Sequence, residues 1–177
     1  MTQCIYFFVI GSFLVWILEI TYKIVTKNYE RLPGILNSPF CILYGFGTVI
    51  CNIIASITQN IILQFILCFL LLSVIEYITY DLLYNIYNIK LWDYSKLKIN
   101  IKGKVSLMFS LAWAVLGVII IQFLIPILNN WFYLNNNIVL KATLLILITY
   151  IAWDFLVSSK RLLNIDGNYS AQKHTAI

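Results

Sequence analysis

Charge is scarce in this 177-residue chain: 11% of the residues are charged, whereas 62% are hydrophobic. Soluble domains contain roughly half apolar residues, because a larger share cannot be hidden from water. The composition therefore excludes an ordinary soluble protein and indicates one that resides in a lipid bilayer. The net charge of +5 does not indicate nucleic acid as a partner, since no basic patch interleaved with aromatic residues accompanies it.

Histidine and paired cysteines are also scarce. His174 is the single histidine, and none of the four cysteines belongs to a C-x-x-C pair. A disulfide scaffold or a metal site is therefore poorly supported, and we expect no cofactor and no metal. The cysteines are better explained as small buried side chains; they are Cys4, Cys41, Cys51 and Cys68.

Several enzyme signatures are missing. Gly103 and Lys104 are followed by Val105, and position 98 is not a glycine, so no phosphate-binding loop of the ATPase type is present. Neither a G-x-S-x-G nor an H-E-x-x-H motif occurs. We expect no catalytic site, and any ATPase that drives this protein would be another polypeptide.

Apolar runs, by contrast, are abundant. Five runs have the length of about 20 residues that crosses ~30 Å of hydrocarbon; they lie near residues 5–24, 40–57, 61–80, 105–128 and 138–157. Only Thr58, Gln59 and Asn60 separate the second and third, which predicts a tight helical hairpin. The first run lacks a basic leader and a cleavage motif, so we expect it to be retained.

These runs predict an all-α polytopic membrane protein: one integral domain, with a bundle of about five transmembrane helices and a flexible tail at 158–177. Every basic residue except Lys141 follows the first, third or fifth run. By the positive-inside rule, the amino terminus is predicted to lie outside the cell membrane and the carboxyl terminus in the cytoplasm.

Three acidic residues fall near the predicted cytoplasmic ends of spans, at a similar predicted depth: Glu19, Glu76 and Asp154. An ionised carboxylate in a bilayer costs a few kcal/mol or more and usually faces protein, water or a cation. The acids either line a cavity for a cation, a proton or an amine-bearing substrate, or only pair with lysines at the interface. Lys23 follows Glu19 by one turn. Lys160 is close to Asp154 in sequence, which favours the second interpretation for that residue.

The predicted cytoplasmic segment between spans three and four is amphipathic. Helical spacing continues to about Ile89, so we expect span three to extend along the headgroups. After Asp93 the period changes to two, which predicts an extended stretch with lysines on one face, each worth ~1 kcal/mol against anionic lipid. These lysines are candidates for contact with headgroups or a partner: Lys96, Lys98, Lys102 and Lys104.

Two predicted spans carry small residues at helical spacing. Such faces let helix backbones approach closely in lipid, so we interpret them as packing seams. They consist of Gly47, Cys51 and Ala55 in the second span and Ser110, Ala114 and Gly117 in the fourth.

Several motifs occur together in one order. They are Trp16-Ile-Leu-Glu19 with Tyr22, the stretch GILNSPFCILYGFG at 34–47, Glu76-Tyr77, Trp92-Asp93-Tyr94-Ser95 and Asn100-Ile-Lys-Gly103-Lys104. From about residue 11 to 120 the chain resembles the CmpB-type ABC-transporter permeases ("type IV"), a family of small bacterial multi-pass membrane proteins. It differs from that pattern at Ser38, where a glycine is usual, and at Ile42, where a second proline is usual. The missing proline argues against a sharp break before span two, although Pro39 and Gly45 could still bend the chain there.

The resemblance implies a permease-like subunit without its own ATPase. It makes a set of residues candidates for a cavity or transport site: Glu19, Glu76, Trp16, Tyr44, Tyr77, Trp92 and Asp93. Because five spans form only a small path, we expect a homo-oligomer or a separate ATPase subunit. A structural or regulatory interaction protein remains the alternative, and a lipid-modifying enzyme the less favoured one.

Overall fold

The computed structural model describes the backbone of residues 1–26 and 35–174, and the side chains of this part except those of 22, 23, 26 and 164–174. Four helices are long and apolar enough to cross a membrane: Thr2–Thr21, Ile61–Tyr87, Leu107–Leu134 and Ile138–Leu163. The helix Ile42–Ile57 is apolar but shorter; its 16 residues span about 24 Å at 1.5 Å per residue. These helices confirm the predicted all-α polytopic fold.

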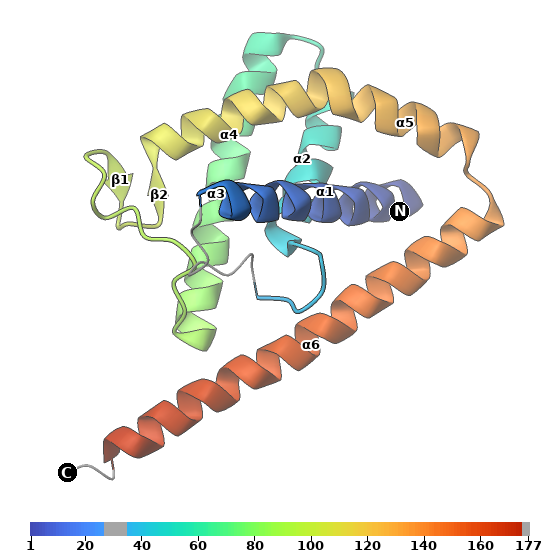
Figure 1. The fold of residues 1–177 in the computed structure, drawn as a ribbon. Helices are drawn as coiled ribbons and strands as arrows, with labels where there is room; N and C mark the ends of the chain where they lie inside the picture. Colours follow the sequence, from blue (N-terminus) through green and yellow to red (C-terminus); the bar gives the residue numbers. More distant parts are fainter. Residues whose placement is uncertain (27–34, 175–177) are drawn as a thin grey trace.

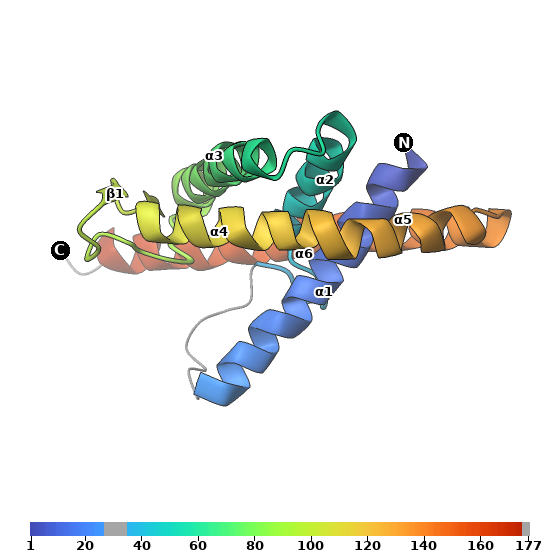
Figure 2. The same cartoon turned by 90° about the horizontal axis from the view of Figure 1, so that it is seen from above.

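The elements follow one another in this order: α1 (Thr2–Thr26), α2 (Ile42–Ile57), α3 (Ile61–Tyr87), β1 (Asn100–Ile101), β2 (Val105–Ser106), α4 (Leu107–Ile119), the π-helix η1 (Ile120–Leu124), α5 (Ile125–Leu134) and α6 (Ile138–His174) (Figure 1). α1 packs most extensively on α2, and α3 on α4. The helix axes cross at wide angles: α2 and α3 stand across the long α4–α5 rod, and α1 crosses it obliquely in Figure 2. The predicted similar depth of Glu19, Glu76 and Asp154 was obtained by counting residues from the helix ends. Because the helix axes are not parallel, this count does not place the three acids at one level.

The predicted hairpin between spans two and three is confirmed. α2 ends at Ile57 and α3 begins at Ile61. The side chain of Asn60 caps α3 by accepting hydrogen bonds from the backbone N–H groups of Ile62 at 2.9 Å and Leu63 at 3.2 Å. A polar cap satisfies donors that lipid could not.

Two glycines allow α1 and α2 to approach each other closely. A Cβ placed on Gly11 would lie 2.0 Å from Oγ1 of Thr48, and one on Gly45 would lie 2.8 Å from the ring of Phe8. Neither distance is compatible with a real side chain. The α1–α2 crossing therefore depends on these two glycines, and it positions the start of α2 beside α1.

The small-residue faces of α2 and α4 form the predicted seam. Cys51, Cys68 and Ala114 are fully buried together between α2, α3 and α4. A Cβ on Gly117 would lie 2.7 Å from Sγ of Cys68. Gly47 is the exception, because a Cβ there would make only an ordinary contact, 3.7 Å from Leu72.

Polar side chains also join the helices within the apolar interior. Gln122 donates to Gln64 at 2.7 Å, and Ser73 donates to Ser110 at 2.7 Å. Gln122 lies in η1, four residues before Pro126. Proline lacks an N–H and clashes with the carbonyl four residues earlier, so a widened turn accommodates it. The sequence predicted a single span at 105–128; the structure extends the helical rod to Leu134.

Two helices run past the ends of the predicted membrane spans. α3 continues to Tyr87, as the helical spacing predicted, and stops where Asn88 adopts a left-handed conformation with φ of 52°. α6 remains helical to His174, beyond the predicted span end at 157. The flexibility of the 158–177 tail stays a prediction.

Candidate functional site

Glu76 is a buried carboxylate on α3, with 4% of its surface exposed. Its Oε1 accepts hydrogen bonds from the Tyr94 hydroxyl at 2.9 Å and from Nε1 of Trp113 at 3.3 Å. Its Oε2 is buried and accepts no hydrogen bond from the part of the chain that the structure describes. The side chain thus faces protein, as an acid at membrane depth must.

A cavity of about 50 Å³ lies against Glu76; we call it the small cavity. The rings of Tyr44 and Trp113, with centroids 5.8 Å apart, contribute to its wall. Thr48 adds a hydroxyl, and the rest of the lining is almost entirely apolar. Glu76 is the only charged side chain that lines it among the described residues.

A second cavity, of about 800 Å³, lies next to the first; we call it the large cavity. Its walls come from α1, the 35–46 stretch, the second half of α3, the 91–94 stretch, α4 and α6. Glu19 is its one charged lining residue within the described chain, and most others are aliphatic or aromatic. The two cavities adjoin, because they share lining residues: Val15, Leu43, Tyr44, Trp113 and Leu116.

The structure brings four of the predicted site residues to these cavities. Glu19, Tyr44 and Trp92 line the large cavity, and Glu76 and Tyr44 line the small one. Trp16 lies outside both and stacks on Phe13.

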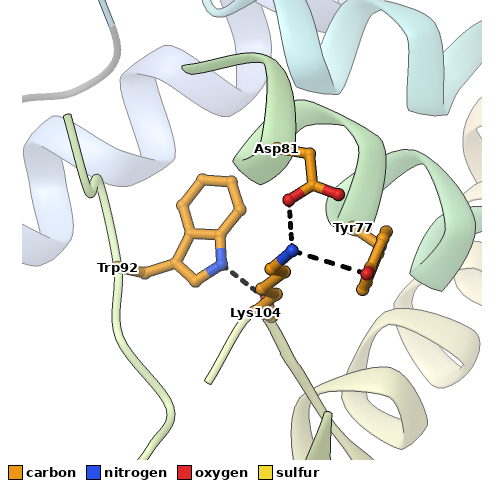
Figure 3. A network of polar contacts seen from close by, with 4 residues as sticks. All are labelled: Tyr77, Asp81, Trp92 and Lys104. Atoms are coloured by element: carbon orange, nitrogen blue, oxygen red, sulfur yellow. Dashed lines mark hydrogen bonds and ion pairs between the residues drawn. The ribbon is translucent and has the colours of Figure 1, made fainter. Parts of the chain in front are cut away.

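Tyr77 and Trp92 belong to a polar network between α3 and the 88–106 segment (Figure 3). The Lys104 ammonium pairs with Asp81, contacts the Tyr77 hydroxyl at 3.4 Å and lies 4.6 Å from the centre of the Tyr77 ring. Nε1 of Trp92 donates to the backbone carbonyl of Lys104 at 2.8 Å. The hydrogen bond to Asp81 raises the pKa of Lys104, with the Tyr77 hydroxyl acting in the same direction. This network holds the 88–106 segment against α3.

Asp93 has a local structural role. Its Oδ1 accepts from the backbone N–H of Ser95 at 2.9 Å, and its Oδ2 lies 3.7 Å from the Lys90 ammonium. The hydrogen bonds from Ser95 lower the pKa of Asp93, and Lys90 contributes in the same sense. A Cβ on Gly103, whose φ is +73°, would lie 2.9 Å from Asp93 Oδ1. Asp93 therefore organises the turn and does not line either cavity.

The prediction of one extended lysine-bearing stretch is wrong. β1 and β2 pair antiparallel, with Asn100 opposite Ser106, and the chain reverses at Lys102 and Gly103, which both have positive φ. The alternation of lysines with apolar residues along this stretch did not predict the turn. The side chain of Asn100 fixes the turn, because its Oδ1 accepts a hydrogen bond from the Gly103 N–H at 2.8 Å. Lys104 therefore turns towards Asp81, whereas the other three lysines of the stretch are exposed: Lys96, Lys98 and Lys102.

The expected pairing of Asp154 with Lys160 is replaced by another arrangement. Asp154 is buried; its Oδ2 accepts from Ser38 N–H at 2.7 Å, and its Oδ1 accepts from the Asn37 side chain at 2.9 Å. Residues six apart on a helix do not share a face, which explains why Lys160 is not the partner. Asp154 thus secures the chain before α2 to α6. The side chain of Lys23 lies outside the described residues, so its pairing with Glu19 stays a prediction.

Sequence reasoning missed two partners of Glu76. Trp113 was not singled out, and Tyr94 entered only as part of a motif. A tryptophan in the middle of an apolar span was an available signal, because its indole N–H needs an acceptor when buried. The pairing of Lys104 with Asp81 was also missed.

Comparison with known proteins gives one match. The sequence profile of the family described as "Putative ABC-transporter type IV" matches residues 6–159, which is most of the chain. No curated protein and no solved structure gives a significant match. Both the resemblance in motifs and the profile thus lead to the same conclusion: the chain belongs to the ABC_trans_CmpB family, described as "Putative ABC-transporter type IV".

Proposed function

We propose that this chain is a permease-like membrane subunit of an ATP-driven transporter whose ATPase is a separate polypeptide. The observation that carries the proposal is the large cavity of about 800 Å³. Ligand sites in proteins have volumes of about 300–1,000 Å³ and are mainly apolar with few polar groups. Family membership supports the same assignment.

The proposed path uses both carboxylates. Glu19 lines the large cavity and Glu76 the small one, with Tyr44 on the wall of both. Tyr94 and Trp92 belong to the 88–106 segment, which touches Glu76 and closes one side of the large cavity. In the proposed orientation this segment is cytoplasmic, and its exposed lysines, Lys96, Lys98 and Lys102, face headgroups or the ATPase.

Affinity purification from mild detergent tests the proposal. The tagged chain is isolated from its native host, and the co-purified proteins are examined for an ATP-binding subunit. We expect such a subunit to be retained, and to be lost from a variant with Lys96, Lys98 and Lys102 changed to glutamate. Recovery of the chain without any ATP-binding protein, at full yield and in a folded state, would refute the proposal.

A structural role is the second candidate, favoured by the two hydrogen bonds that Glu76 accepts. If packing is its only role, Glu76→Gln should behave like the native chain in reconstituted flux, since the amide oxygen can still accept both bonds. Glu76→Leu should instead lower the thermal unfolding midpoint, because it leaves two donors unpaired at a cost of about 1–3 kcal/mol each. Loss of flux in a folded Glu76→Gln variant would favour transport.

A further inference from the structure

Glu76 and the small cavity have the chemistry of an ammonium site. The carboxylate is 4% exposed and lines the small cavity, and its Oε2 is left without a hydrogen-bond donor in the described chain. A buried carboxylate is stable only with a cation or donors close by. Tyr44 and Trp113 line the same cavity, and aromatic rings attract organic cations.

The size of the small cavity restricts the cation. Its volume of about 50 Å³ accommodates a few groups of water size, since about 10–15 Å³ of such space holds one water. A primary ammonium group fits this space and offers N–H donors for Oε2 of Glu76, whereas a trimethylammonium group has no N–H to donate. Thr48 also lines this cavity, and its hydroxyl donates to the backbone carbonyl of Tyr44 at 2.9 Å.

The adjoining large cavity has the complementary chemistry for an apolar chain. It is lined mainly by aliphatic and aromatic residues, and it meets the small cavity at Tyr44 and Trp113. A molecule with an ammonium group at Glu76 would extend its apolar part past these rings into the large cavity. Apolar burial there and ion pairing at Glu76 would act on the two ends of one ligand.

We infer that the site binds an amphipathic primary amine, with its ammonium group at Glu76 and its hydrocarbon part in the large cavity. This inference rests on the proposed function, because it names the substrate class of the permease subunit. Glu19, in the large cavity, adds a second negative charge along the route of the amine.

Binding to the purified subunit tests the inference without any ATPase. The full chain is placed in phosphatidylcholine nanodiscs, and equilibrium dialysis measures the uptake of radiolabelled decylamine, with protein-free nanodiscs as the blank. We expect saturable binding that Glu76→Gln weakens about tenfold or more, because it removes an ionic hydrogen bond. Asp93→Asn is the matched control: it removes the same charge, keeps an acceptor for Ser95 and lies outside both cavities.

Ligand analogues separate the two halves of the site. Decanol should compete weakly and equally in the native chain and in Glu76→Gln, and decyltrimethylammonium should compete more weakly than decylamine. If Glu76→Gln does not fold, Trp113→Leu compared with Trp113→Phe takes its place, since only the phenylalanine keeps an aromatic face. Absence of saturable decylamine binding, or equal affinity in native and Glu76→Gln chains, would overturn the inference. In that case, co-purification of an ATPase would still support the proposed function. Failure of this inference can therefore be distinguished from failure of the proposed function.

Discussion

At the scale of single residues, Glu76 shows how this protein accommodates an acid at membrane depth. The carboxylate pairs with no lysine in the part of the chain that the structure describes. It is enclosed by donors from two other segments, the Tyr94 hydroxyl and the Trp113 indole. Hydrogen bonds to a charged group contribute about 1.5–3 kcal/mol each, which offsets part of the burial cost.

The backbone conformation at position 103 favours glycine over other residues. Its φ of +73° and the 2.9 Å distance from an added Cβ to Asp93 Oδ1 both oppose a side chain. We expect Gly103→Ala to destabilise the 88–106 segment by about 1–3 kcal/mol. Amide hydrogen exchange in this segment should accelerate. Gly47→Ala is the control, because its Cβ would meet only Leu72 at 3.7 Å; equal exchange in both variants would contradict the prediction.

The lowered pKa of Asp93 predicts that the stability of the same turn depends on pH. The hydrogen bonds from Ser95 lower the pKa of Asp93, so its ionised form is favoured in the folded state. The stabilisation is therefore present above the unfolded-state pKa of about 3.9 and is lost as the pH falls through the lower folded-state value. Hydrogen exchange at the Ser95 amide, corrected for intrinsic rates, should become less protected at acidic pH. Asp93→Asn should show a smaller change over the same range.

At the scale of elements, the α1–α2 crossing depends on two glycines. Gly11→Ala would place a Cβ 2.0 Å from Thr48 Oγ1, so the helices must move apart. Overpacking of this kind costs about 1–3 kcal/mol. We expect a lower thermal unfolding midpoint in detergent for Gly11→Ala, whereas Gly47→Ala, on α2 but facing Leu72 of α3, should leave it nearly unchanged. A midpoint unaffected by Gly11→Ala would mean that the two helices are not in this close contact.

The 88–106 segment is the element that connects the cavities with the predicted cytoplasmic side. Tyr94 joins it to Glu76, and Lys104 joins it to Asp81. Asp81 and Tyr77 lie four residues apart on α3, so they present one polar face to the lysine (Figure 3). A movement of this segment would therefore alter the hydrogen bonding of the buried carboxylate directly.

At the scale of the whole molecule, the exposed surface is suited to lipid. Large apolar side chains point outward on several helices; examples are Ile62, Leu134 and Ile138, with 71%, 76% and 78% of their surface exposed. Water would make such a surface unstable or aggregation-prone, whereas hydrocarbon does not. Together with four helices of sufficient length, this surface agrees with the family assignment.

The predicted orientation can be tested by cysteine labelling. In a background where Cys4, Cys41, Cys51 and Cys68 are replaced by alanine, a single cysteine is introduced at Lys96 or at Asn136, both exposed. We expect a membrane-impermeant maleimide to label the Asn136 variant in intact cells. The Lys96 variant should react only after the cells are permeabilised. Labelling of both variants from outside would contradict the positive-inside prediction.

The sequence singled out some of the residues that line the two cavities, and their role in a site stays a prediction. Glu19, Glu76, Tyr44 and Trp92 were all singled out, and each lines a cavity. Glu19 and Glu76 stood out because a carboxylate at membrane depth is costly, whereas Tyr44 and Trp92 were implied by the family resemblance. Asp154 was assigned the wrong type of partner, and Trp113 was overlooked, because their partners are 116 and 37 residues away in sequence. Spacing along one helix carries no information on such contacts.

Hydropathy and charge along the sequence alone determined the solvent of this protein, its helical class, the α2–α3 hairpin and the extension of α3. These properties depend on runs of neighbouring residues, and local physics is enough to specify them. Only the tertiary structure decided the wide helix crossings, the turn at Gly103 and the enclosure of Glu76 by Tyr94 and Trp113. Each of these depends on close approach between segments distant in the chain, where a few ångströms determine whether a donor, a ring or a Cβ can be accommodated.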